Sequence, residues 1–310
     1  MHKVTVVGAG NVGATCAFQL AERNVATHIT MIDIVDGMPQ GKALDMAQCG
    51  SIFDFDAHLE GSNDLAAVEG SDVVVVTSGI PRKPGMDRMD LLKTNAGIMK
   101  DVATNIREHA PDAIVVVITN PLDVMAYAML QVTGFPRDRV IGMAGVLDAA
   151  RFRRFIAWEI GCSVRDVNAM VLGGHGDQMV PMPRFSTVNG VAITELIPDD
   201  RIQALCDRTR TGGGEIVKLL KTGSAFYAPA GSGTVMVEAI LRDTGHIVPA
   251  CAFLQGEYGY EDLYIGVPCM LGKEGLKQIV ELELNEDEKR MLDVSAEAVS
   301  KGIEDVKQFL

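Results

Sequence analysis

The chain has 310 residues, of which 47% are hydrophobic and 22% charged, a balance that excludes a disordered or low-complexity protein. Its 41 acidic residues outnumber its 28 lysines and arginines, and the formal net charge of −13 would repel nucleic acid and anionic lipid surfaces. No apolar run has the length of a membrane span or of a secretory signal, so we expect a cytoplasmic protein without membrane partners.

Short runs rich in valine and isoleucine alternate with longer segments of helical periodicity in the first half of the chain. The predicted strands are Lys3–Val7, Ile29–Ile32, Asp72–Val76 and Ala113–Ile118, and the predicted helices are Val12–Glu22, Gly37–Gln48 and Leu91–His109. Continuous apolar strands with helices between them are typical of a parallel sheet covered on both faces. We therefore predict an α/β fold with a doubly wound parallel sheet. Because 310 residues exceed what one hydrophobic core usually organises, we expect two domains.

The sequence pattern changes after Gly142. Helices are predicted at Val146–Ile160, around Asp200–Leu220, at Thr234–Arg242 and from Glu286 onward; strands are predicted near Ile247–Leu254, Leu263–Val267 and Leu276–Leu282, and a hairpin at Asn189-Gly190. This mixture predicts an α+β domain, and we place the two domains at residues 1–143 and 144–310. The charge run of the last helix is interpreted as a solvated face rather than a binding surface.

A glycine-rich segment follows the first predicted strand and opens the first predicted helix. Glycines in this position allow a tight turn, admit a pyrophosphate against bare backbone, and let the helix pack on the strand, while amides at the helix end bind the anion. An ordinary glycine-rich turn is the alternative, which the position between strand and helix disfavours. We expect a dinucleotide to bind to Gly8, Ala9, Gly10, Asn11, Val12 and Gly13.

Asp33 ends the second predicted strand, twenty residues after Gly13. A carboxylate at this spacing accepts hydrogen bonds from the ribose hydroxyls of an adenosine and repels a 2′-phosphate. We therefore expect the cofactor NAD rather than NADP. The alternative is that Asp33 only caps the turn that follows it.

A basic loop, Gly79–Arg88, follows the predicted strand Asp72–Val76. Its prolines and glycines disfavour regular structure, and loops at the carboxyl ends of parallel strands lie over the ligand crevice. Arg82 and Arg88 can bring positive charge to an anion bound there. Taken singly, each arginine would be interpreted as part of a solvated turn.

Asn120 stands at the end of the predicted strand Ala113–Ile118, in the segment Thr119-Asn120-Pro121. Its side chain faces the same crevice, and Pro121 can start the next helix. A helix-capping role and a ligand-binding role are both open for Asn120, and the two are compatible.

His175 is the only one of the six histidines that sits among glycines, in Gly173-Gly174-His175-Gly176. Glycine neighbours free the backbone and leave the imidazole open to a cleft, where its pKa near about 6.5 suits proton transfer. Asp148 and Arg151 lie three residues apart on one helix face. They can pair with each other, or they can act with His175, the carboxylate holding the imidazole and the guanidinium binding a substrate carboxylate.

The six cysteines, Cys16, Cys49, Cys162, Cys206, Cys251 and Cys269, form no C-x-x-C pair. Neither a disulfide framework nor a zinc site is predicted, and the cysteines are interpreted as small apolar residues. We expect no metal.

In their order and spacing, these motifs resemble, from end to end, the malate dehydrogenases of the lactate-dehydrogenase-like kind. The resemblance rests on Gly8–Gly13, Asp33, Ile80–Arg88, Thr119-Asn120-Pro121, Gly145–Arg151 and Gly173–Asp177. It implies a doubly wound parallel (Rossmann) sheet followed by a smaller α+β substrate domain. It also implies NAD as cofactor and the reversible oxidation of (S)-malate to oxaloacetate by hydride transfer.

The resemblance further implies a role for each site residue. His175 would accept and return the proton, Asp148 would orient it, and Arg88 would polarise the reacting oxygen. Substrate binding would fall to Arg82, Arg88, Asn120 and Arg151, with Arg82 selecting a second carboxylate. Cofactor binding would involve, besides the glycine-rich segment and Asp33, the residues Asn95, Ile118, Thr119 and Asn120.

Three alternatives and one departure from the family pattern stay open. The first alternative is a lactate dehydrogenase, which would need a neutral residue at position 82. The second is a catalytically silent NAD-binding protein, and the third is a module that binds another adenosine ligand; both would share the motifs of the nucleotide-binding half. Gly231-Ser232-Gly233 stands where relatives carry bulkier residues, which leaves the substrate-side wall undefined.

A homo-oligomer, tetramer or dimer, is expected from the resemblance and from apolar surface on the helices Gly37–Gln48 and Val146–Ile160.

Overall fold

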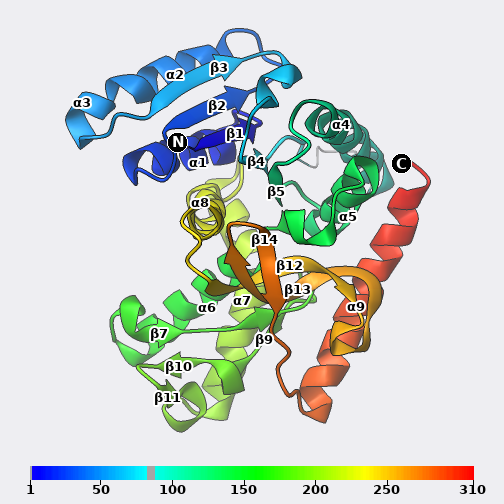
Figure 1. Cartoon of the computed structure of the whole chain (residues 1–310). Helices are drawn as coiled ribbons and strands as arrows, with labels where there is room; N and C mark the ends of the chain where they lie inside the picture. The colour runs from blue at the N-terminus through cyan, green and yellow to red at the C-terminus, as the bar shows by residue number, and fades with distance from the viewer. Residues whose placement is uncertain (1, 82–87) are drawn as a thin grey trace.

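A mixed sheet runs through both halves of the chain in the computed structural model, which describes residues 2–81 and 88–310 (Figure 1). Within these residues the sheet has nine strands, in the order β14-β13-β12-β6-β5-β4-β1-β2-β3. The parallel strands are β1 (Lys3–Val7), β2 (His28–Ile32), β3 (His58–Ser62), β4 (Val73–Val76), β5 (Ile114–Val117) and β6 (Val140–Gly142). Beside β6 lie the antiparallel strands β12 (His246–Gln255), β13 (Glu261–Gly272) and β14 (Gly275–Ile279).

The parallel strands have the spatial order 3-2-1-4-5-6, so the chain reverses its direction of travel between β1 and β4. Because crossovers between parallel strands are right-handed, helices before and after this reversal cover opposite faces. The first set is α1 (Asn11–Glu22) and α2 (Met38–Gln48), with the short α3 (Gly50–Phe53); the second is α4 (Arg88–His109) and α5 (Leu122–Thr133). The predicted doubly wound sheet is therefore confirmed.

The second half adds further helices and small sheets. Its helices are α6 (Gly145–Ile160), α7 (Asp199–Leu220), α8 (Tyr227–Leu241) and α9 (Glu286–Lys307). Its short strands are β7 (Val167–Asn168), β8 (Val171–Leu172), β9 (Val180–Pro181), β10 (Thr187–Val188) and β11 (Val191–Ala192), with the predicted hairpin between the last two. Helices α6 and α7 and strands β7, β10 and β11 lie below the main sheet, while α9 runs beside α5 (Figure 1). This part has a smaller core of its own, which includes Phe152, Ile156 and Ile193, whereas the buried residues of α8, β12, β13 and α9 belong to the core of the first half.

The observed elements differ from the predicted ones in a few places. Strands β3 and β6 were not predicted, because β3 carries one buried apolar residue and β6 is only three residues long. Helix α8 begins at Tyr227 instead of Thr234: Pro229 falls in its first turn, where no intrahelical N–H is needed. The predicted domain boundary, 143/144, falls in the connection between β6 and α6. Among the described residues, no helix combines the length and the apolar character needed to cross a bilayer.

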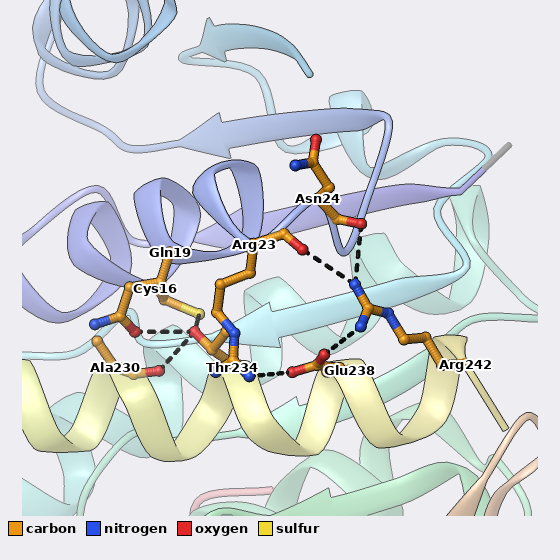
Figure 2. Close-up of polar contacts among 8 residues, drawn as sticks. All are labelled: Cys16, Gln19, Arg23, Asn24, Ala230, Thr234, Glu238 and Arg242. Atoms are coloured by element: carbon orange, nitrogen blue, oxygen red, sulfur yellow. Dashed lines mark hydrogen bonds and ion pairs between the residues drawn. The ribbon is translucent and has the colours of Figure 1, made fainter. Parts of the chain in front are cut away.

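Helix α8 of the second half packs against α1 of the first, and side chains join the two (Figure 2). The Thr234 hydroxyl lies 3.1 Å from Gln19 Oε1, and an alanine Cβ at Gly233 would come within 2.7 Å of Ile118 Cδ1. Gly233 therefore lets α8 lie close to Ile118, at the end of β5.

The end of the contact between α1 and α8 is a charged cluster around Glu238 (Figure 2). Its carboxylate lies 2.6 Å from Arg23 Nη2 and 2.6 Å from Arg242 Nη1. Arg242 also donates to the carbonyl oxygens of Arg23, at 3.0 Å, and Asn24, at 3.3 Å, at the end of α1. Glu238 thus forms ion pairs with one arginine from each half of the chain.

We expect Glu238→Gln to lower the free energy of unfolding by about 0.5–1 kcal/mol, since both arginines are about half exposed and their ion pairs are partly screened. Thermal unfolding at fixed protein concentration measures the change, and the difference should shrink in concentrated salt. Glu297→Gln, an exposed position on α9, is the control and should leave the unfolding midpoint unchanged. Equal unfolding midpoints for the wild type and Glu238→Gln in low salt would show that the ion pairs of Glu238 do not stabilise the protein.

Candidate active site

The strand register brings the predicted site residues to one edge of the sheet. Ile32, Val7 and Val76 lie side by side in the ladders, and Val76 pairs in turn with Val117. The residues that follow these strand ends therefore emerge next to one another. The reversal point between β1 and β4 lies in the middle of this edge, which is where open α/β sheets bind their ligands.

The glycine-rich segment adopts a turn that side chains would block. Gly8 has a φ of +104°, and a Cβ there would lie 2.6 Å from Thr77 Oγ1. A Cβ at Gly13 would lie only 1.8 Å from the backbone oxygen of Gly8. At Gly10, the N-cap of α1, a Cβ would meet no atom within 4 Å, and this residue borders a cavity. The amides of the first turn have no acceptor inside the helix and suit an anion.

A cavity of about 500 Å³ lies beside this turn, lined by residues that include Gly10, Asp33 and Ser78. The Ser78 hydroxyl is buried and has no hydrogen-bond partner among the described residues. Asp33 accepts from the Ala9 amide at 2.8 Å and from the Val35 amide at 3.1 Å, which fixes its carboxylate at the rim. An anion-binding helix end, an orphaned hydroxyl and a fixed carboxylate fit the phosphates and ribose of a dinucleotide.

Asn95 and Thr119 hold together the backbone segments that follow β4 and β5. Asn95, on α4, accepts from the Ile80 amide at 2.9 Å and donates to the Asn120 carbonyl at 2.8 Å. The Thr119 hydroxyl donates to the Ser78 carbonyl at 2.8 Å. Both side chains are buried, so their amide and hydroxyl groups shape the wall of the crevice. Their predicted contacts with the cofactor remain predictions.

His175, Asp148 and Arg151 form one cluster. Asp148, almost fully buried on α6, lies with Oδ2 2.9 Å from His175 Nδ1 and with Oδ1 3.1 Å from Arg151 Nη1. Asp148 and Arg151 therefore pair with each other, and the same carboxylate contacts the imidazole; substrate binding by Arg151 stays a prediction. Arg151 Nε is buried and has no hydrogen-bond partner within residues 2–81 and 88–310 as the structure describes them.

The surroundings of His175 favour its protonated form. Burial alone would lower the pKa of this imidazole, but the charge and hydrogen bond of Asp148, together with the charge of Asp123, outweigh burial and raise the pKa above 6.5. Arg151 counteracts part of this rise. Because Nδ1 faces a carboxylate, it carries the proton in the neutral ring, and Nε2 is left as the acceptor.

Asp123 is a site residue that sequence reasoning missed. It lies buried in the first turn of α5, where its Oδ2 accepts from the His175 backbone amide at 2.9 Å and its Oδ1 accepts from the Cys251 thiol at 3.1 Å. Burial raises the pKa of this carboxyl, and these hydrogen bonds offset part of the rise. A lone carboxylate in the otherwise apolar segment Leu122–Leu130 was the signal, since such groups are seldom buried without a role.

A second cavity, of about 230 Å³, lies beside the imidazole. Asn120 and His175 line it, together with Leu91, Leu92, Pro121, Val124 and Gly302. Asn120 is exposed, so its side chain is accessible to a ligand. The structure thus brings Asn120 and His175, 55 positions apart in the sequence, to one small cavity.

Two predicted substrate residues fall on the basic loop. Arg82 lies outside the described residues, as does the rest of the segment 82–87. Arg88 is the first residue of α4, but its side chain is likewise outside what the structure describes. Among the described residues, no group of three histidine, cysteine, aspartate or glutamate side chains could hold a metal ion.

Family models match nearly the whole chain. Residues 2–142 match the NAD binding domain of lactate/malate dehydrogenase, and residues 145–310 match the alpha/beta C-terminal domain of the same family. The malate dehydrogenase of Thermomicrobium roseum is 55% identical to this chain over 308 residues, which cover 99% of each protein.

Solved structures agree with the family models. The apo malate dehydrogenase of Picrophilus torridus is 46% identical, with a TM-score of 0.97 over 99% of this chain and 98% of that one. A lactate dehydrogenase of Cryptosporidium parvum, solved with lactic acid and NAD, is 40% identical, with a TM-score of 0.95 over 99% of this chain and 98% of that one. Since both enzymes share the fold, the choice between malate and lactate must rest on particular side chains.

We expect Asp148→Asn to lower the pKa of His175, because the amide keeps a similar shape but removes the negative charge that favours the imidazolium. Half-protonation should then occur at a lower pH than in the wild type, as followed by the imidazole signals in an NMR titration. Asp54→Asn serves as the control, since Asp54 is exposed and its left-handed backbone suits asparagine. An unchanged midpoint for His175 in Asp148→Asn would rule out the charge interaction.

Proposed function

This chain belongs to the lactate/malate dehydrogenase family, and from that premise we propose that it catalyses the reversible NAD-dependent oxidation of (S)-malate to oxaloacetate. The family predicted from the sequence is confirmed, and with it the class of NAD-dependent oxidoreductases. The observation that carries the proposal is the contact of one buried carboxylate, Asp148, with both a proton-accepting imidazole and an anion-binding guanidinium.

In this proposal His175 moves the proton. With Nδ1 bonded to Asp148, the free Nε2 accepts the proton of the malate hydroxyl as the hydrogen on the same carbon leaves with its electron pair. Bound NAD supplies the acceptor for that hydride. In the reverse direction the His175 imidazolium returns the proton to the new alkoxide. Malate oxidation thus needs neutral His175, so its rate rises as the pH increases through the raised pKa of this residue. Oxaloacetate reduction needs the imidazolium, so its rate falls over the same pH range.

Arg151 would bind the substrate carboxylate next to the reacting carbon, because a planar guanidinium matches a carboxylate with two parallel hydrogen bonds. Its fixed position on Asp148, which also contacts His175, supports this role. Asn120, which lines the small cavity together with His175, would also bind the substrate. Arg88, at the start of α4, would stabilise charge on the reacting oxygen, and Arg82 would bind the second carboxylate of a dicarboxylic acid.

The cofactor would lie along the carboxyl edge of the sheet. The turn Gly8–Gly13 and the first-turn amides of α1 would bind its phosphates, and Asp33 would bind the adenosine ribose. Asn95 and Thr119, through the backbone segments that they connect, would line the nicotinamide side, together with Ile118 and Asn120.

We also propose a division into domains at 143/144, a homo-oligomeric state and a cytoplasmic location. The division is supported by the separate apolar core around α6 and α7. Six free cysteines suit a reducing compartment. A second copy of the chain, in a dimer or tetramer, would cover large exposed side chains, which gather on α2–α3, α6 and α7: Leu44, Ile52, Phe53, Trp158, Leu219 and Leu220.

The purified protein should reduce oxaloacetate with NADH far faster than it reduces pyruvate. Arg82→Gln should narrow the ratio of kcat/KM for the two acids by about 100- to 1000-fold, because a desolvated ion pair with the second carboxylate is lost. His175→Asn, which removes the proton acceptor, is the inactive control.

Two outcomes would contradict these assignments. A wild-type preference for pyruvate would replace malate with lactate as the substrate. An unchanged ratio in Arg82→Gln would leave malate oxidation in place but remove Arg82 from substrate selection.

We expect Asp33→Ser to bring the KM values for NADH and NADPH closer together, since the variant no longer repels a 2′-phosphate and loses a ribose acceptor. Steady-state kinetics with each cofactor at saturating oxaloacetate measures the ratio. The control is Asp36→Ser, an exposed aspartate on the same connection. If Asp33→Ser and Asp36→Ser show the same cofactor ratio as the wild type, Asp33 only shapes the turn.

A further inference from the structure

Both polar groups of one buried residue in the glycine-rich segment, Ala9, are held by charged side chains. The Ala9 amide donates to Asp33 Oδ2 at 2.8 Å, and Lys42 Nζ donates to the Ala9 carbonyl oxygen at 2.7 Å. Asp33 directly follows β2, and Lys42 lies on the next helix, α2. Two consecutive parts of the chain therefore form hydrogen bonds with the same residue of the turn. Lys42 has no place in the roles assigned so far.

Lys42 acts on the peptide group that points at the phosphate site. The Ala9 carbonyl and the Gly10 amide belong to one peptide unit, and in a trans peptide the C=O and N–H bonds point in opposite directions. With Lys42 on the oxygen, the Gly10 N–H is turned away from the lysine. Gly10 lines the cavity of about 500 Å³ beside the glycine-rich turn and is the N-cap of α1. Its N–H is therefore one of the amides at the helix start that have no acceptor within the helix and can bind an anion.

The charge of Lys42 strengthens this donor in addition to orienting it. A cation that accepts electron density from a carbonyl oxygen polarises the peptide unit and makes its N–H a better donor, as in any hydrogen-bonded chain. Lys42 is half-buried as a residue, so solvent screens its charge less than that of an exposed lysine.

We propose that Lys42 is a positioning residue for the cofactor's pyrophosphate, acting through the Ala9 carbonyl to orient and polarise the Gly10 amide. The inference deepens the cofactor role in the proposed function and rests on it. It assigns Lys42 an effect on phosphate-bearing ligands, and none on the adenosine pocket or on the chemistry at His175.

The test measures ligand binding to the protein without turnover, with Lys42→Met, which keeps the length of the side chain but removes its charge and donor. NADH affinity is followed by fluorescence, and ADP-ribose and adenosine are titrated as competitors. We expect Lys42→Met to weaken NADH and ADP-ribose about tenfold, as for a lost charged hydrogen bond, and to change adenosine less than about twofold. Lys42→Arg should restore most of the affinity, and Lys301→Met, an exposed lysine on α9, should match the wild type.

Each other outcome overturns the inference in a distinguishable way. Unchanged ADP-ribose binding in Lys42→Met would remove Lys42 from phosphate recognition. Equal weakening of ADP-ribose and adenosine would show that Lys42 only supports the pocket. A lower kcat at saturating NADH would place its effect in the chemical step. If the wild type itself failed to bind NADH, the proposed function would fall, and this inference with it.

Discussion

The register of the parallel strands is the constraint on which the site depends. Because Ile32, Val7, Val76 and Val117 end at one level, every segment that follows them is delivered to the same edge of the sheet. The turn at Gly8 is then possible only without a side chain, since Thr77 from the neighbouring strand occupies the space that a Cβ would need. A shift of one residue in any of these ladders would move these strand ends to different levels and separate the cofactor turn from its neighbours.

Burial strengthens the interactions among the charged residues around His175. Asp148 is nearly inaccessible to solvent, and so its charge acts on His175 and Arg151 through little intervening water. A buried carboxylate of this kind is stable only when its oxygens are occupied, and here one oxygen serves the imidazole and the other the guanidinium. Asp123 extends the arrangement to the backbone of His175, while the thiol of Cys251 occupies its other oxygen.

Most of the fold and the positions of the chemical groups were predictable from the sequence, because local patterns carry them. Periodic valines define the central strands, glycines define the cofactor turn, and His175 is marked by its glycine neighbours. Long-range pairing was not predictable: nothing in the local pattern of His246–Gln255 says that this strand pairs with β6, nor that α8 packs on α1. Asp123 and Lys42 were missed for the same reason, since each acts on a backbone group that is distant in the sequence.

The antiparallel strands β12–β14 continue the parallel sheet instead of forming one of their own, with Cys251 paired to Gly142 at the junction. Without them, β6 would be an uncovered edge of nearly apolar sequence, open to pairing with any other extended chain. The nucleotide-binding half expressed by itself would therefore carry a built-in tendency to aggregate.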